Sequence, residues 1–442
     1  IKFMDLLKSI FKGDKVIWII FLFLCLISIV EVFSAASTLT YKSGDHWGPI
    51  TQHSIILMVG AVVVVFMHNI PYKWFQVFPV FLYPVSLVLL AFVTLMGIIT
   101  GDRVNGAARW MTFMGLQFQP SEVAKMAVII AVSFILSKKQ DEYGANPKAF
   151  KYIMILTGLV LILIAPENLS TAMLLFGVVF MMMFIGRVAA KKLLLLAGGL
   201  ILIGALGVGT VVAIPAKTLH STPGLHRLET WQNRIKGFFD KDEVPAAKFD
   251  IDKDAQIAHA RIAIATSHVV GKGPGNSIQR DFLSQAFSDF IFAIVVEEMG
   301  LIGGIFVVFL YLWLLMRAGR IAQKCERTFP AFLVMGIALL LVSQAILNMM
   351  VAVGLFPVTG QPLPLVSKGG TSTLINCAYI GMILSVSRYT AHLEEQKEHD
   401  AQLQLQIETN AADSEAQAAA EPTAQILNSD AKFEDENDIN KG

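Results

Sequence analysis

Residues 76 to 97 read QVFPVFLYPVSLVLLAFVTLMG, a stretch that contains no Asp, Glu, Lys, Arg or His. An α-helix rises 1.5 Å per residue, so about 20 apolar residues cross the hydrocarbon core of a bilayer. This segment therefore predicts a transmembrane helix. The whole chain of 442 residues is 55% hydrophobic and only 16% charged, against about 25% charged residues in an average soluble domain. These figures exclude a soluble globular fold.

Nine further apolar runs of similar character accompany this one. The ten predicted spans lie near residues 16–36, 53–70, 76–97, 121–137, 151–165, 169–186, 193–214, 289–316, 331–354 and 371–388. Only Pro166-Glu167-Asn168 separates the fifth span from the sixth, so we expect these two to form a tight hairpin. The expected fold class is an all-α integral membrane protein with about ten transmembrane helices and one large extracytoplasmic loop that contains interfacial helices.

The orientation follows from the basic residues in short loops, because Lys and Arg are retained on the cytoplasmic side. With the N-terminus inside, the short inner segments hold sixteen Lys and Arg, whereas the short outer loops hold Lys42, Arg103, Arg109 and Lys368. Both termini are therefore expected in the cytoplasm. The first apolar run shows no small-residue cleavage site and is expected to remain as an anchor.

Five regions follow along the chain. They are a cytoplasmic segment (1–15), helices one to seven (16–214), the large outer loop (215–288), helices eight to ten (289–388) and an acidic cytoplasmic tail (389–442). The chain has 35 Lys and Arg and 34 Asp and Glu, yet residues 391 to 442 hold 13 acids and 3 Lys, so the body is basic. We expect the tail to be mostly disordered, with room for a short helix at 393–407. It could recruit a cytosolic partner or be solvated filler.

Two polar segments flank the start of the fourth span. The outer loop GDRVNGAARW ends at Arg109 and Trp110, and QPSEVAK ends at Lys125. Ser121 is a candidate N-cap, and Glu122 suits the first turn of a helix. Lys125 lies one turn inside an apolar helix, so it either pairs with Glu122 at i,i+3 or receives an anionic lipid head group. Trp110 could equally be an interfacial aromatic residue.

The eighth span begins with SDFIFAIVVEEMG. Asp289 stands where the long outer loop enters this helix, as either a helix cap or a base whose pKa is raised by apolar neighbours. Glu297 lies eight residues further along the same face, about 12 Å deeper, so that face is expected to line something polar. Glu298 points about 100° away and is expected to pair with another helix.

A proline-rich and glycine-rich segment, GLFPVTGQPLPLVSKGGTS, precedes the tenth span. Its three prolines prevent regular helix, and Gly369 and Gly370 let backbone N–H groups approach an anion at the helix start. Lys368 adds charge there, although an ordinary re-entrant turn fits the spacing equally well. In the outer loop, residues 256–265 have helical periodicity, and GKGPGNS (271–277) lacks the order of a phosphate loop. Cys25, Cys325 and Cys377 predict neither a disulfide framework nor a metal site.

Taken together, these motifs resemble the SEDS family of polytopic peptidoglycan glycosyltransferases, typified by FtsW and RodA. The resemblance runs from about residue 16 to 388. Its most specific segments, in family order, are GAARW (106–110), QPSEVAK (119–125), GKGPGNS (271–277), SDFIFAIVVEEMG (288–300) and GLFPVTGQPLPLVSKGGTS (354–372).

The resemblance implies a cavity between the outer loop and the outer helix ends in which lipid II is polymerised, with Asp289 as the essential acid. It also implies that substrate contacts come from a set of neighbouring residues: Arg109, Trp110, Glu122, Lys125, Ser367, Lys368, Gly369, Gly370 and Thr371, with Glu297 added from its position on the helix face. The chain departs from the family where His-Thr-Asp reads Phe287-Ser288-Asp289, where Asp-Leu-Gly-Thr reads Asn168-Leu169-Ser170-Thr171, and where Tyr is replaced by Lys368. The missing His leaves more of the predicted base chemistry to Asp289.

These features lead to a mechanistic hypothesis: Asp289 takes a proton from the acceptor sugar while Arg109, Lys125 and Lys368 hold the undecaprenyl diphosphates. No cofactor is expected, although a divalent cation could bridge the diphosphate. The expected partners are lipid II, the lipid-linked glycan strand, membrane lipid, divisome proteins and a class B penicillin-binding protein, without nucleic acid. The expected location is the inner membrane at the division septum.

Three alternatives are kept. The acidic tail favours the division branch of the family, FtsW, over the elongation branch, RodA. A lipid II flippase or other transporter would also have many helices and buried charges, but it should show related halves, and we see no internal repeat. A noncatalytic division scaffold would tolerate changes at Asp289.

Overall fold

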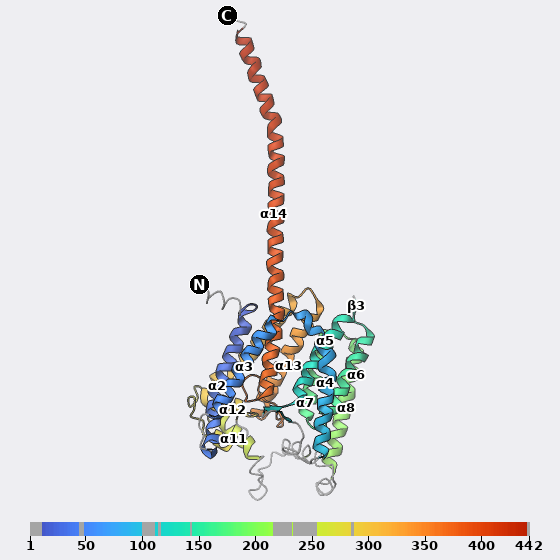
Figure 1. Ribbon diagram of the computed structural model, residues 1–442, viewed down its shortest axis with the longest axis vertical. Helices are drawn as coiled ribbons and strands as arrows, with labels where there is room; N and C mark the ends of the chain where they lie inside the picture. Colours follow the sequence, from blue (N-terminus) through green and yellow to red (C-terminus); the bar gives the residue numbers. More distant parts are fainter. Residues whose placement is uncertain are drawn as a thin grey trace. The chain divides into compact units, whose positions relative to one another are not determined.

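The computed structural model describes residues 11–43, 48–99, 111–113, 116–141, 144–214, 232, 254–283 and 287–439. The chain divides into two compact units, Ile1–Arg388 and Tyr389–Gly442. In the first unit, long helices run alongside one another as a bundle (Figure 1).

Each predicted span corresponds to a long helix in the described parts of the chain. The helices are α2 (Lys15–Ser43), α3 (Gly48–Asn69), α4 (Phe78–Ile99), α5 (Pro120–Lys138), α6 (Pro147–Ile164), α7 (Leu169–Ile185), α8 (Ala190–Ala213), α12 (Ile291–Gln323), α13 (Thr328–Ala352) and α14 (Thr371–Ile439). Among the described residues, eight helices have the length and hydropathy to cross a membrane, and α7 is a shorter apolar helix of 17 residues. The predicted fold class is confirmed.

Short elements fill the connections. They are the 3-10 helices η1 (Tyr72–Gln76) and η3 (Gln279–Phe282), the helix α11 (Asp254–Ala265), and two antiparallel hairpins, β1 (Met111–Phe113) with β2 (Leu116–Phe118) and β3 (Gln140–Asp141) with β4 (Gly144–Ala145). The helix α11 covers the predicted helix at 256–265. The hairpin of α6 and α7 is also present, with the Asn168 side chain accepting a hydrogen bond of 3.2 Å from Thr171 N at the start of α7.

The core of the first unit lies around α5 and α13. These two helices pack on each other, and α13 also packs on α7 and α12. Residues on all sides of α5 and α13 are buried, whereas α8 exposes most of its side chains, including Leu195 and Ile201. Helices buried in protein can carry polar side chains that a lipid-facing helix could not carry without cost. Helices α5 and α13 can therefore carry buried polar side chains at lower cost than a lipid-facing helix.

One end of the bundle brings together the start of α2, the end of α3 and Arg388. The Arg388 guanidinium donates to Asn69 Oδ1 and to Asn69 O, each at 3.2 Å, and a Cβ on Gly13 would lie 3.1 Å from Leu384 O. The Asp14 carboxylate N-caps α2 and pairs with Arg317 near the end of α12. The start of α2 and Arg388 thus share one end, as an even number of crossings requires. That this end faces the cytoplasm stays a prediction.

Helix α12 is broken at Gly300, which has φ 73° and ψ −174°. The carbonyls of Glu297 and Glu298 accept from Lys272 N (3.0 Å) and Gly273 N (2.8 Å) instead of from helical N–H groups. On the other side of the break, Leu301 N and Ile302 N donate to His268 O and Val269 O at 3.1 and 3.3 Å. Residues 268–273 therefore supply the hydrogen bonds that the broken helix lacks.

Gly300→Ala is expected to destabilise the protein by about 2 kcal/mol or more, because a Cβ there would lie 2.4 Å from Gly271 N at a backbone angle that disfavours side chains. Thermal unfolding of the purified protein in detergent measures the effect. Gly177→Ala is the matched control, since a Cβ at this helical glycine meets nothing within 4 Å. Equal unfolding temperatures for the two variants would contradict the close crossing.

The acidic tail continues from the tenth predicted span. α14 extends as helix to Ile439. Ala, Gln and Glu, which dominate this segment, are among the strongest helix formers, so it can be helical without burying apolar surface. That the tail is mostly disordered stays a prediction. The described side chains from Glu394 to Ala412 are almost all exposed, including Leu403, Leu405 and Ile407.

Candidate functional site

Asp289 lies in the turn Phe287–Phe290, directly before α12. Its side chain is half-buried, and Ser288 Oγ donates to Asp289 Oδ1 at 3.0 Å. The N-cap residue of α12 is Phe290, which makes no side-chain cap hydrogen bond. Asp289 is therefore not the N-cap residue itself, because the turn places the start of the helix one residue further along the chain. Its role as a base stays a prediction.

The connection between α13 and α14 is hydrogen-bonded to this turn. Ser367 Oγ donates to Ser288 O at 2.6 Å and accepts from Leu363 N at 2.8 Å. Lys368 N donates to Phe287 O at 2.9 Å, and the Lys368 ammonium lies 5.7 Å from the centre of the Phe287 ring. Burial lowers the pKa of the Lys368 ammonium. The structure thus brings Ser367 and Lys368 to the turn that carries Asp289; their contact with substrate stays a prediction.

The glycine pair forms the turn that begins α14. Gly370 has φ 48°, and Gly369 O accepts from both Ser372 N (2.9 Å) and Ser372 Oγ (2.8 Å). A Cβ on Gly369 would crowd Ser372 Oγ, so a larger residue there would turn the Ser372 hydroxyl away from Gly369 O. Thr371, the first residue of α14, is half-buried. Gly369, Gly370 and Thr371 directly follow Lys368 in the chain and lead into α14.

The second half of the site is the pair Glu122 and Lys125 on α5. Lys125 Nζ lies 2.8 Å from Glu122 Oε1, and both side chains are buried, with 0% and 3% exposed. Of the two sequence interpretations, the i,i+3 salt bridge is the one observed. Glu122 Oε2 is buried without a hydrogen-bond partner among the described residues. Ser121 is not the N-cap; that position is Gln119, because Pro120 is fixed in the first helical position.

Two amide side chains of α13 connect the halves. Gln344 Oε1 accepts from Lys125 Nζ at 3.0 Å, and Gln344 Nε2 donates to Pro362 O at 3.0 Å. Asn348 Nδ2 donates to Asp289 O and to Gln361 O, each at 2.8 Å. Neither amide was among the residues predicted from the sequence. The rule that singled out Lys125, a polar residue within an apolar span, would have found them.

Helices α2 and α3 also contact the connection between α13 and α14. Ser28 Oγ donates to Val366 O at 2.7 Å and lies 2.8 Å from His53 Nε2. Both side chains are buried in predicted spans, and neither was predicted from the sequence as part of the site. Together with Gln361 Nε2, which donates to Thr171 Oγ1 at 2.7 Å, these contacts tie the connection to α2, α3 and α7.

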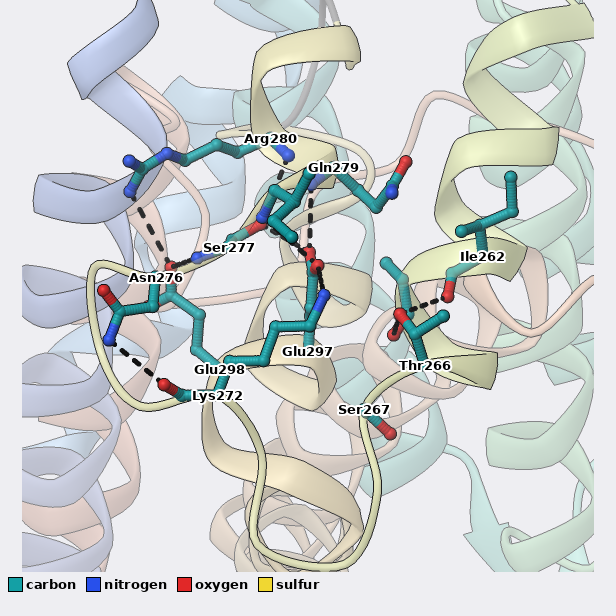
Figure 2. A network of polar contacts seen from close by, with 12 residues as sticks. Ile262, Thr266, Ser267, Lys272, Asn276, Ser277, Gln279, Arg280, Glu297 and Glu298 are labelled. Carbon is teal, nitrogen blue, oxygen red and sulfur yellow. Dashed lines mark hydrogen bonds and ion pairs between the residues drawn. The ribbon is translucent and has the colours of Figure 1, made fainter.

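Glu297 is not on an open surface. Its carboxylate is fully buried and accepts from four groups of the loop that precedes α12: Lys272 Nζ, Ser277 Oγ, Ile278 N and Gln279 N (Figure 2). Glu297 was predicted to contact substrate, but its carboxylate binds the preceding loop instead. The reason is that residues 271–277 fold back onto α12 and cover this face. The Glu297 carboxylate also forms an ion pair with the partly exposed Lys272 ammonium.

Glu298 anchors the same loop from the next position. Its carboxylate accepts from Gly275 N (2.9 Å), Ser277 N (3.2 Å) and the Ser34 hydroxyl of α2 (Figure 2 shows the loop contacts). Arg280 NH1 lies 4.0 Å from Glu298 Oε1 and 2.9 Å from Ser34 Oγ. The predicted pairing with another helix is confirmed. The GKGPGNS segment is thus bound to α12 through the carboxylates of Glu297 and Glu298. This structural role agrees with the absence of the residue order typical of a phosphate-binding loop.

Two predicted contacts, Arg109 and Trp110, lie outside the described residues. Within the ranges that the structure describes, no group of three or more His, Cys, Asp and Glu side chains could hold a metal ion.

The chain matches the model of a protein family described as cell cycle protein, FtsW/RodA/SpoVE, over residues 14–392. The chain belongs to this family. Among similar relatives in the FtsW/RodA/SpoVE family are two proteins named probable peptidoglycan glycosyltransferase FtsW. The one from Trichlorobacter lovleyi is 33% identical, with 85% of this chain and 93% of the relative covered. The one from Halomonas elongata is 31% identical, with 82% and 87% covered.

Solved structures share the FtsW/RodA/SpoVE fold. One, described as "Structural coordination of polymerization and crosslinking by a peptidoglycan synthase complex", superposes with a TM-score of 0.66 at 24% identity and covers 86% of this chain and 98% of its own. The rod shape determining protein RodA of Thermus thermophilus gives a TM-score of 0.57 at 24% identity, with 85% and 97% covered.

Proposed function

We propose that this chain is a peptidoglycan glycosyltransferase that polymerises lipid II into β-1,4-linked glycan strands during septal wall synthesis, with Asp289 as the base. The observation that carries the proposal is the position of Asp289. Its turn directly precedes α12 and is hydrogen-bonded to the connection that carries Ser367 and Lys368. Relatives over most of this chain's length bear the name of that enzyme.

The proposed reaction is a single displacement with inversion at the anomeric carbon. The Asp289 carboxylate takes the proton of the GlcNAc 4-hydroxyl of lipid II, and that oxygen bonds to C1 of the terminal MurNAc of the lipid-linked strand. The bond from C1 to the diphosphate oxygen breaks, and undecaprenyl diphosphate leaves with the electron pair. One base and nearby positive charge are sufficient for this step.

The positive charge is assigned to Lys368 and Arg109 as direct contacts of the diphosphates. Lys125, which is fully buried against Glu122 and Gln344, belongs to the same site but is proposed to act through these partners. Ser367, Gly369, Gly370 and Thr371 shape the turn that presents Lys368. A divalent cation bound to the diphosphate as part of the substrate would act in the same sense as Lys368.

The proposal extends to partners and location. A class B penicillin-binding protein is the proposed transpeptidase partner, since a solved structure with this fold is described as coordinating polymerization and crosslinking. Divisome proteins and membrane lipid complete the set. We place the chain in the inner membrane at the septum, with both termini in the cytoplasm, on the distribution of Lys and Arg.

Lys368→Met is expected to raise the KM for lipid II about tenfold, because a charged contact to a phosphate contributes on the order of 1.5–3 kcal/mol. Methionine keeps the length of the side chain and removes the charge. Steady-state polymerisation at several lipid II concentrations measures KM, and Lys324→Met, in the loop between α12 and α13, is the control. An unchanged KM in Lys368→Met would remove this residue from the diphosphate site.

The experiment that tests the proposed function uses purified full-length chain, fluorescent lipid II and detergent, without an ion gradient. Glycan chains that a muramidase digests are the expected product, with or without the transpeptidase partner. A transporter would bind lipid II and yield no chains. A scaffold would yield none alone and would support the partner equally well with Asp289→Asn.

A further inference from the structure

Gln344 and Asn348 lie one turn apart on α13, buried at the centre of the first unit. We propose that these two amides are positioning residues for glycosyl transfer: they hold the Asp289 turn and the 361–363 segment in register with the Glu122–Lys125 pair. The inference rests on the proposed function of Asp289 and adds to it how the base is kept in place.

The orientation of the Asn348 amide is fixed by its neighbours. Its two N–H groups point to two carbonyl oxygens, Asp289 O and Gln361 O, each at 2.8 Å. A backbone carbonyl can only accept, so the amide cannot turn over without losing both bonds. Asn348 therefore clamps the backbone of Asp289 itself to the connection that carries Ser367 and Lys368.

Gln344 is oriented by the same logic. Lys125 Nζ can only donate and Pro362 O can only accept, so Oε1 must face the lysine and Nε2 the carbonyl. The contacts form a continuous series from Glu122 through Lys125 and Gln344 to Pro362. The Glu122–Lys125 pair on α5 is thereby linked, through Gln344, to the backbone carbonyl of Pro362.

The connection needs such donors because its own sequence denies it regular structure. Pro357, Pro362 and Pro364 prevent helix, and a segment without ladder bonds leaves its carbonyls to be satisfied by side chains. Gln361 O and Pro362 O are both satisfied by α13. The two amides thus convert an irregular segment into a fixed support for the base.

Loss of this support should affect the chemical step more than substrate binding. A misplacement of about 1 Å in a catalytic group can cost on the order of 10²-fold in rate. Neither amide is assigned to contact lipid II, so KM should hardly change. We expect kcat to fall about 10- to 100-fold in Asn348→Leu and in Gln344→Met, both close in shape to the native side chains, with KM within about threefold of wild type.

The test measures kcat and KM for lipid II polymerisation with purified full-length protein, together with thermal unfolding. Asn69→Leu is the matched control: it removes an amide at the opposite end of the bundle that bonds Val65 O and Arg388. The milder Asn348→Ser covers the case in which Asn348→Leu does not fold, and it should also lower kcat more than it changes KM.

The outcomes separate the two proposals. A fall in kcat at constant KM in the α13 variants, absent from Asn69→Leu, supports the positioning role. Wild-type kcat in folded Asn348→Leu or Asn348→Ser, with Asp289→Asn inactive, overturns the positioning role and leaves the base intact. A rise in KM at constant kcat overturns it as well, in favour of substrate contact. Wild-type kcat in Asp289→Asn refutes the proposed function instead.

Discussion

Asp289→Asn should lower the kcat of lipid II polymerisation by about 10²- to 10⁴-fold, the usual contribution of a positioned general base. The amide has nearly the shape of the carboxylate and can still accept a hydrogen bond from Ser288 Oγ, which lies 3.0 Å from Asp289 Oδ1. It cannot accept the proton of the sugar hydroxyl. Binding of lipid II should persist, because the diphosphate contacts are assigned to other residues. A gel assay of glycan length over time gives the rate, and a filter-binding assay gives the affinity.

Asp141→Asn is the matched control for this prediction. Asp141 lies in the β3–β4 hairpin and accepts a hydrogen bond from Asn146 Nδ2 at 3.0 Å. It makes no contact with the Asp289 turn among the hydrogen bonds described above. It should polymerise at the wild-type rate. If Asp289→Asn unfolds at the wild-type temperature and polymerises as fast as Asp141→Asn, another group must be the base.

Lys125→Met should destabilise the protein by about 3–5 kcal/mol, because it leaves the buried Glu122 carboxylate without its cation. It should also lower kcat about 10- to 100-fold, as Gln344→Met does, since Gln344 loses the partner that orients its amide. The double variant Glu122→Gln with Lys125→Met removes both charges and should recover most of the lost stability. Denaturation in detergent measures stability for the two single variants and the double variant.

Recovery of stability without recovery of activity is the expected pattern in the double variant. It would show that the pair serves the site through Gln344 as well as through its own charge balance. Additive losses in the double variant would instead mean that Glu122 and Lys125 do not interact in the folded protein. Full activity in the double variant would mean that the site does not need Lys125.

The helices were predictable from sequence because the bilayer imposes a simple length rule, and each apolar run such as 76–97 became a helix. The Glu122–Lys125 pair was predictable too, since i,i+3 spacing on one helix fixes the distance. The role of Glu297 was not, because its partners at 272–279 come from a loop whose fold the spacing of α12 does not reveal. Helical spacing put Glu297 on a face but could not say what covers that face.

Contacts between distant segments were beyond sequence reasoning. Gln344 meets a lysine 219 residues earlier in the chain, and Glu298 meets a serine 264 residues earlier. For the tail, low apolar content predicts the lack of a packed core, but it does not decide whether Ala, Gln and Glu form a helix.

The most direct test of Asp289 as a base changes the acceptor along with the enzyme. In an acceptor analogue of lipid II with a thiol in place of the GlcNAc 4-hydroxyl, the nucleophile ionises near pH 8.5 and needs no base. We predict that Asp289→Asn joins the thiol acceptor to a lipid-linked strand within about tenfold of the wild-type rate while losing about 10²-fold or more with the alcohol. Equal losses with both acceptors would contradict proton transfer to Asp289.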